Sequence, residues 1–122
     1  MYVVSNAGCK VKDIQLMSSM EHYYKSRGKD VSLKLRDDLA LLAVQGPQSA
    51  AVVQELTKID LSKLYFMQTR YGSIAGIDGC RITRCGYTGE DGVEISVPSD
   101  KAVHLADALM SSKVSDVSSK KT

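Results

Sequence analysis

The residues best suited to chemistry lie between Cys80 and Val97, in the sequence CRITRCGYTGEDGVEISV. Apolar and polar residues alternate at both ends of this stretch, which predicts two strands joined by a glycine-rich loop. The loop contains Gly86, Gly89 and Gly92, where the backbone can adopt a positive φ or approach a ligand closely. We therefore expect a hairpin whose loop contributes to a small-molecule site.

Glu94 and Tyr87 are the side chains of this hairpin that point to binding. Val93 and Ile95 are apolar and are predicted to face a core, so the alternation of a strand turns Glu94 toward the other face. A carboxylate on an open sheet face, beside an aromatic hydroxyl on a flexible loop, suits a small polar ligand. The alternative interpretation is a solvated hairpin whose acidic loop only keeps the protein soluble.

Asn6 is a further candidate, because it ends a valine-rich segment, Tyr2–Asn6, that is predicted to be a short strand. Its side-chain amide offers both a donor and an acceptor at the mouth of a site. Alternatively, the side chain holds the following turn through a hydrogen bond to the backbone. The residues alone leave both roles open.

Composition excludes several classes of function. The chain has 122 residues, of which 43% are hydrophobic, enough for one modest core. Its net charge of +2 comes from interspersed acidic and basic residues, so no basic stripe indicates nucleic-acid binding. No apolar stretch approaches the roughly 20 residues that cross a bilayer, and no signal-like or targeting leader follows Met1. We expect a soluble protein with no membrane or nucleic-acid partner.

The cysteines and histidines do not indicate a metal centre. The chain has three cysteines and no CxxC pair, which fits a reducing compartment better than a disulfide framework. Cys80 and Cys85 are five residues apart and would point to opposite faces of a strand. His22 and His104 are isolated and are predicted to lie on helix surfaces. We expect no metal site.

The first part of the chain is predicted to be a short βαβ piece. A strand over Tyr2–Asn6 precedes an amphipathic helix over Lys12–Ser26, which Gly28 is placed to end. A second strand is expected over Val31–Lys34. Residues 1–36 therefore form a segment distinct from the rest of the chain.

The remainder alternates strands and helices. Leu39–Val44 is predicted to be a strand covered on both faces, because it is almost entirely apolar. The sequence Gln45-Gly46-Pro47, which we interpret as structural, leads into a helix over about Pro47–Lys58. A strand is expected around Phe66–Arg70, and a capped helix over Asp100–Met110 follows the hairpin. The predicted core face of this last helix comprises Ala102, Val103, Ala106, Leu109 and Met110.

The order of these elements predicts an α+β fold. From residue 37 to 111 it reads strand, helix, irregular strand, strand, strand, helix, which is most of a ferredoxin-like split βαβ lobe with helices on one face. The closing strand of such a lobe is missing. Residues 112–122 are polar and serine-rich, and we expect a disordered tail.

The segment RCGYTGEDGVEISVP resembles the signature of the glycine-cleavage T protein, the folate-dependent aminomethyltransferase. Tyr2–Cys9 (YVVSNAGC) and Leu41–Pro47 (LLAVQGP) match the same family in the same order and at fitting distances. The similarity extends from Tyr2 to about Leu109. Looser versions of the signature occur in the folate-binding modules of dimethylglycine and sarcosine dehydrogenases, which remain an alternative.

The resemblance implies a fold, an activity and partners. T proteins have three lobes, arranged like a cloverleaf around a central tetrahydrofolate. By this resemblance, residues 1–36 would end the first lobe and residues 37–111 would form most of the second. The family transfers an aminomethyl carbon from the lipoyl arm of a carrier (H) protein to tetrahydrofolate, with release of ammonia, during glycine catabolism. The implied partners are tetrahydrofolate and the lipoylated carrier, and the implied location is the mitochondrial matrix.

The resemblance also assigns residues. Glu94 occupies the position of a glutamate that binds the pterin ring, and Tyr87, Tyr2 and Asn6 match positions along the folate pocket. The family's catalytic aspartate lies upstream of the segment that matches Tyr2, and its folate-carboxylate arginines lie downstream. We therefore expect no catalytic residue in these 122 residues and no aminomethyl transfer by them alone. The alternative to an enzyme is a truncated, non-catalytic polypeptide, and a transcript that continues past Met110 would distinguish the two.

Overall fold

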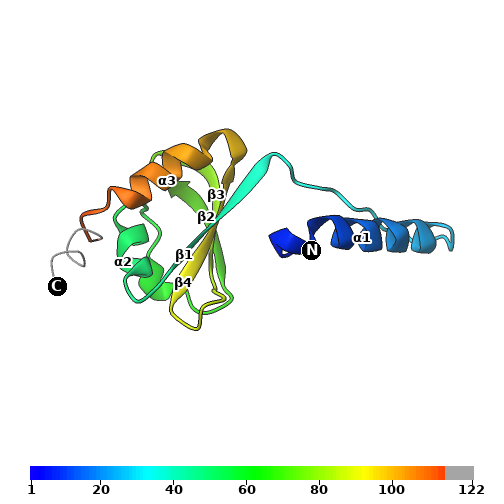
Figure 1. The fold of residues 1–122 in the computed structure, drawn as a ribbon, viewed down its shortest axis with the longest axis horizontal. Helices are drawn as coiled ribbons and strands as arrows, with labels where there is room; N and C mark the ends of the chain where they lie inside the picture. The colour runs from blue at the N-terminus through cyan, green and yellow to red at the C-terminus, as the bar shows by residue number, and fades with distance from the viewer. Residues whose placement is uncertain (115–122) are drawn as a thin grey trace. The chain divides into compact units, whose positions relative to one another are not determined.

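The computed structural model describes residues 1–114 of the chain. Contacts between residues divide the chain into two compact units, Met1–Arg36 and a larger unit that begins at Asp37. The larger unit contains a sheet and two helices that cover one of its faces, as Figure 1 shows.

The N-terminal unit consists of a short 3-10 helix, η1 (Ala7–Cys9), and the helix α1 (Lys10–Lys25). The predicted helix is confirmed, but its predicted amphipathic character is wrong, because its apolar residues do not gather on one face and none of its residues is buried. Gly28 has a φ of +70° and its N–H donates to the Lys25 carbonyl at 3.0 Å, while the Lys29 N–H donates to the Tyr24 carbonyl at 3.1 Å. This pair of bonds is a Schellman motif, so Gly28 ends the helix as predicted.

The two strands predicted in this unit are wrong. Neither Tyr2–Asn6 nor Val31–Lys34 forms a strand, and the first strand among the described residues begins at Leu39. Valine-rich alternation favours an extended backbone, but a strand also needs a neighbour whose backbone groups complete its ladder. Residues 1–36 are therefore helix and irregular chain instead of a βαβ piece.

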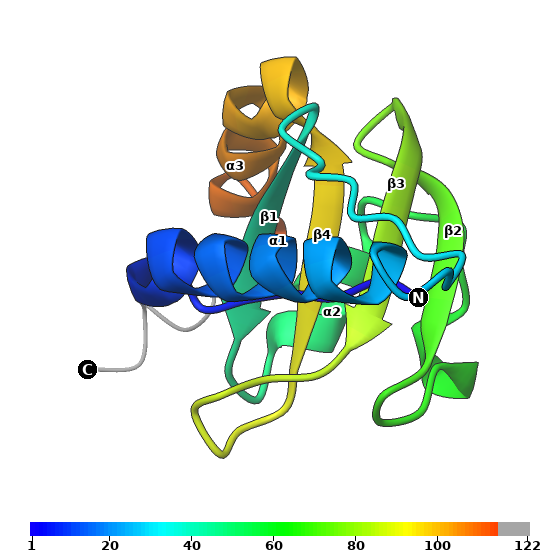
Figure 2. The same ribbon diagram turned by 90° about the vertical axis from the view of Figure 1, so that its right-hand side faces the viewer.

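The larger unit contains one antiparallel sheet of four strands, in the order β1-β4-β3-β2 (Figure 2). The strands are β1 (Leu39–Gln45), β2 (Thr69–Ile74), β3 (Ile77–Arg84) and β4 (Gly92–Pro98). Because β4 runs antiparallel to both β1 and β3, those two strands run parallel to each other on either side of it. This arrangement confirms the predicted α+β class and is compatible with a partial ferredoxin-like lobe. The outer edge of β1 carries no partner strand within residues 1–114.

Two helices and two short 3-10 segments complete this unit: α2 (Ser49–Gln54), η2 (Leu61–Lys63), η3 (Ser99–Lys101) and α3 (Ala102–Met110). Helix α2 is much shorter than the predicted Pro47–Lys58. The Gln54 amide donates to the carbonyls of Thr57 and Ile59 at 3.1 and 2.9 Å and accepts the Leu61 N–H at 2.9 Å. The chain therefore wraps around this side chain instead of continuing the helix.

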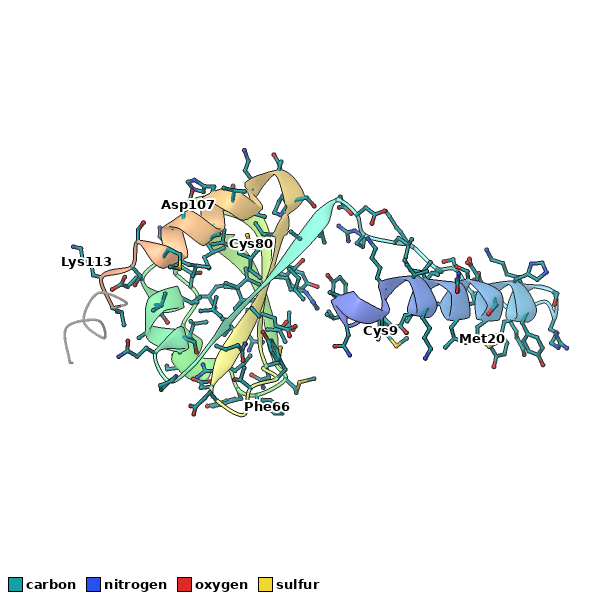
Figure 3. All side chains as sticks on the ribbon, viewed as in Figure 1. Cys9, Met20, Phe66, Cys80, Asp107 and Lys113 are labelled. Carbon is teal, nitrogen blue, oxygen red and sulfur yellow. The ribbon has the colours of Figure 1, made fainter. Side chains whose placement is uncertain are left out.

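Strand β2 begins at Thr69, three residues after the predicted start at Phe66. A tight turn occupies the intervening positions, because the Gln68 N–H donates to the Tyr65 carbonyl at 2.9 Å and Met67 has a φ of +62°. The turn presents Phe66 to solvent, as its labelled side chain shows in Figure 3.

The core lies between the sheet and the two helices. Its fully buried side chains include Val53 of α2, Leu105 of α3, and Ile82, Ile95 and Val97 of the sheet. The predicted core face of α3 is partly wrong. Leu105 is 0% exposed, whereas Val103 and Met110 are 73% and 80% exposed. Ala102, Leu105 and Leu109 follow the i, i+3, i+7 spacing of one helix face, and Val103 is turned about 100° away from Ala102.

Two further expectations are corrected. Strand β1 is not covered on both faces: Ala40 and Leu42 pack toward the core, while Leu41 is 41% exposed on the other face. Ser112, in the segment expected to be a disordered tail, is 4% exposed, and its hydroxyl donates to the Glu55 carboxylate at 2.7 Å. Residues 115–122 of that expected tail lie outside the described residues.

The two faces of the sheet predict different costs for truncated side chains. We expect Ile95→Ala to lower the free energy of unfolding by about 3 kcal/mol, because it leaves a cavity at a fully buried position of β4. The control Leu41→Ala should cost less than about 1 kcal/mol, since this side chain is already half exposed. Urea unfolding followed by circular dichroism measures both. Equal losses for the two variants would contradict this assignment of faces.

Candidate functional site

Glu94 lies on the face of the sheet opposite the helices. The register pairs it with Ala43 of β1 on one side and Thr83 of β3 on the other. Its neighbours along the strand, Val93 and Ile95, are both 0% exposed on the helix-covered face. Glu94 itself is half-buried, so it points away from the core as its sequence position predicted. We call this face, which no helix of the larger unit covers, the open face.

Hydroxyl groups continue the row that starts at Glu94. Thr83 and Thr69 share a hydrogen bond between their hydroxyls at 2.8 Å, and the register places both on the open face. Ser96 lies two residues beyond Glu94 on the same face, but it is only 3% exposed. The open face is therefore polar along β3 and β4, which suits a ligand that hydrogen-bonds.

Cys85 lies beside Glu94, directly after the end of β3. Burial raises the pKa of the Cys85 thiol, and the Glu94 carboxylate raises it further through its charge. The positive charge of Arg81 acts in the opposite direction. The thiol is therefore protonated at neutral pH.

Asp91 stabilises the glycine-rich loop that precedes β4. Its carboxylate accepts two bonds from the Arg84 guanidinium, at 2.7 and 2.5 Å, and these bonds hold the pKa of Asp91 below its usual range. Its backbone carbonyl accepts the Gly46 N–H at 2.8 Å and the Ser49 hydroxyl at 3.2 Å. Asp91 is thus occupied by structural contacts, which agrees with its position in a loop.

Tyr87, near the start of the same loop, is 78% exposed. A hollow of about 610 Å³ lies between this loop and the chain around η2, with Leu61, Leu64 and Phe66 on one side and Gly89 and Glu90 on the other. Neither Tyr87 nor Glu94 lines this hollow. The two residues therefore share a hairpin but not this hollow.

Tyr2 and Asn6 belong to the N-terminal unit. Asn6 directly precedes η1, where its backbone carbonyl accepts the Cys9 N–H at 2.9 Å and its side chain makes no capping hydrogen bond. The turn is therefore closed by the backbone of Asn6 and not by its amide. Tyr2 is 42% exposed.

Gln45 is the residue whose importance the sequence did not reveal. Its side-chain Nε2 donates to the backbone carbonyls of Cys85 and Val93, at 3.3 and 3.4 Å. A Cβ atom added at Gly86 or Gly92 would lie 2.0 or 2.3 Å from its Oε1. Two glycines spaced six apart were the only signal in the sequence, and nothing in the sequence connects them to Gln45.

Two classes of site lack support among residues 1–114. No three histidine, cysteine, aspartate or glutamate side chains of this part come together as ligands for a metal ion. None of its helices is long and apolar enough to cross a membrane.

The contact between Cys85 and Glu94 predicts a pH-dependent reactivity. We expect Glu94→Gln to lower the pKa of the Cys85 thiol, because the variant removes the negative charge. At about pH 7.5 more thiolate is then present, so iodoacetamide should alkylate Cys85 about three to ten times faster.

Peptide mapping by mass spectrometry separates Cys85 from the exposed Cys9 and the buried Cys80. The control is Glu90→Gln, which removes a carboxylate from the loop before β4 and should leave the alkylation rate of Cys85 unchanged. Equal alkylation rates in the Glu94→Gln variant and the unmodified chain would refute the contact.

Comparison with known proteins identifies the family. Residues 1–117 match the model of the GCVT N-terminal domain. The chain is 54% identical over 110 residues to the mitochondrial aminomethyltransferase of Homo sapiens and 52% identical over 110 residues to that of Pisum sativum. Each alignment covers 90% of this chain and 27% of the relative. The names of these relatives agree with the mitochondrial location that the resemblance implied. Since the family model covers almost the whole sequence, the chain belongs to the GCVT N-terminal domain family.

Proposed function

We propose that this chain supplies part of the tetrahydrofolate-binding site of a mitochondrial aminomethyltransferase of the glycine cleavage system. The observation that carries the proposal is Glu94, a half-buried carboxylate on the open face of the sheet. It lies in a polar row with Thr83 and next to the loop that bears Tyr87. The mitochondrial aminomethyltransferases that the chain resembles provide the reaction to which this site would contribute.

The chemistry of Glu94 suits a pterin. An ionised carboxylate has two oxygens that accept parallel hydrogen bonds from adjacent N–H donors, as in a planar aminopyrimidine ring. Holding that ring fixes the orientation of the folate nitrogens that receive the one-carbon unit, and such positioning is a large part of catalysis. Tyr87, Tyr2 and Asn6 match positions of the family's folate pocket and are proposed to contribute to folate binding as well.

The role of these residues is binding and orientation. The chain spans about a quarter of the length of the curated relatives, so transfer of the aminomethyl carbon from a lipoylated carrier protein is proposed for the longer protein. The proposed reaction forms two bonds from that carbon to two folate nitrogens and breaks its bonds to sulfur and to the amino nitrogen. The two hydrogens displaced from the folate nitrogens end on the lipoyl thiol and on the released ammonia. The 122 residues are proposed to bind tetrahydrofolate without completing this reaction themselves.

The affinity of the chain for tetrahydrofolate tests the proposal. We expect Glu94→Gln to weaken binding at least tenfold, because the amide loses the charge and one acceptor of the pair. Isothermal titration calorimetry under anaerobic conditions measures the dissociation constant.

The matched control for this measurement is Glu90→Gln, which changes an exposed carboxylate of the neighbouring loop and should leave the affinity unchanged. Equal affinity of the Glu94→Gln variant and the unmodified chain would show that Glu94 does not bind the pterin.

A further inference from the structure

The side chain of Gln45 ties together the two ends of the glycine-rich loop. It ends β1, and its Nε2 donates to the carbonyls of Cys85 and Val93. Cys85 is the last residue before the loop, and Val93 immediately precedes Glu94. A single amide group therefore fixes the backbone on both sides of residues 86–92.

The glycines at both ends of the loop leave room for this side chain. A Cβ at Gly86 or Gly92 would lie far inside the contact distance of the Gln45 Oε1 atom, at 2.0 and 2.3 Å. Neither glycine has a positive φ, so the requirement at both positions is space and not backbone conformation. The amide of Gln45 thus packs directly against Gly86 and Gly92, at a distance that leaves no room for a Cβ atom.

Placing the Gln45 amide at this position also lowers the stability of the fold, which indicates that the amide has a role beyond filling space. Its Oε1 is buried and has no hydrogen-bond partner among the described residues. A buried acceptor without a partner destabilises the folded state, so an apolar side chain of the same size would serve a purely structural purpose equally well. The two bonds from Nε2 are what an apolar side chain could not supply.

The next residue reinforces the same connection. Gly46 has a φ of +121°, which favours glycine, and its N–H donates to the Asp91 carbonyl at 2.8 Å. The end of β1 therefore contacts Asp91 within the loop and the two residues that flank the loop, Cys85 and Val93. Tyr87 lies in loop 86–92, and Glu94 directly follows Val93.

We propose that Gln45 is a positioning residue whose side-chain amide sets the conformation of loop 86–92 and thereby aligns Tyr87 and Glu94 for the pterin ring. This inference rests on the proposed function, because it assigns Gln45 a role in the same folate site. Gln45 does not contact the ligand in this account and acts through the backbone carbonyls that it holds.

The first test replaces Gln45 by methionine, which has a similar volume but no donor. We expect Gln45→Met to raise the dissociation constant for tetrahydrofolate about tenfold while the protein stays folded by circular dichroism. In the absence of folate, the Gly46 amide should exchange with solvent at least about tenfold faster, while the amides of Ile82 and Ile95 exchange as before. Gln48→Met makes the same change at an exposed position and should alter neither quantity.

The second test is a double-mutant cycle. We expect Gly92→Ala to accelerate exchange of the Gly46 amide in the unmodified chain, because its methyl group collides with Gln45. In a Gln45→Ala background the space is free, so Gly92→Ala should add less than about a twofold further change. Gly8→Ala, where an added Cβ meets no atom within 4 Å, is the neutral glycine control.

Three results would overturn the proposal: unchanged affinity and exchange in Gln45→Met, loss of the folded state in that variant, or equal effects of Gly92→Ala in both backgrounds. Failure of the proposed function looks different. In that case neither the unmodified chain nor Glu94→Gln binds tetrahydrofolate, while exchange of the Gly46 amide still depends on Gln45. Gln45 would then still fix the conformation of loop 86–92, but its proposed role in a folate site would be wrong.

Discussion

The whole arrangement depends on the burial of alternate residues along β4. Val93, Ile95 and Val97 are completely buried under the helices, and this places Glu94 on the open face. A strand that slipped by one residue would move the carboxylate into the core and expose three branched side chains. The register of β4 between β1 and β3 is therefore fixed by apolar packing, and the position of the candidate ligand-binding group is a consequence of it.

The glycine-rich loop is the second level of the same construction. Because β3 and β4 are held by the core, the loop between them begins and ends at fixed points. The Arg84–Asp91 pair and the amide of Gln45 then restrict the path that the loop can take between those points. Within the larger unit, the proposed site consists of this open face and this loop, and neither Glu94 nor Tyr87 is among the residues that line the hollow around η2.

The sequence predicted the elements whose pattern is local. The period of two around Ile82 and Ile95 identified β3 and β4, and Gly28 identified the end of α1, because strand alternation and helix termination leave a direct trace in the chain. The valine-rich segment at Tyr2–Asn6 has the same local trace and yet forms no strand, since pairing depends on a distant neighbour.

Contacts between distant residues explain the remaining differences. Gln45 fits against Gly86 and Gly92, which follow it by more than forty positions, and no period links them. The core face of α3 depended on where the sheet lies, so Leu105 was missed. The proposed role of Glu94 rests on the family resemblance, because the strand pattern predicted only which face of the sheet its side chain is on.

The central claim is that the open face of the sheet, and not the helix-covered side, binds the pterin. The most direct measurement is a titration of the ¹⁵N-labelled chain with tetrahydrofolate, followed by backbone amide chemical shifts. The account predicts that the shifts change together at Ala43, Thr83, Glu94 and the loop 86–92, while the amides of α2 and α3 stay in place. Changes confined to α2 and α3, or to residues 61–66 around η2, would contradict it.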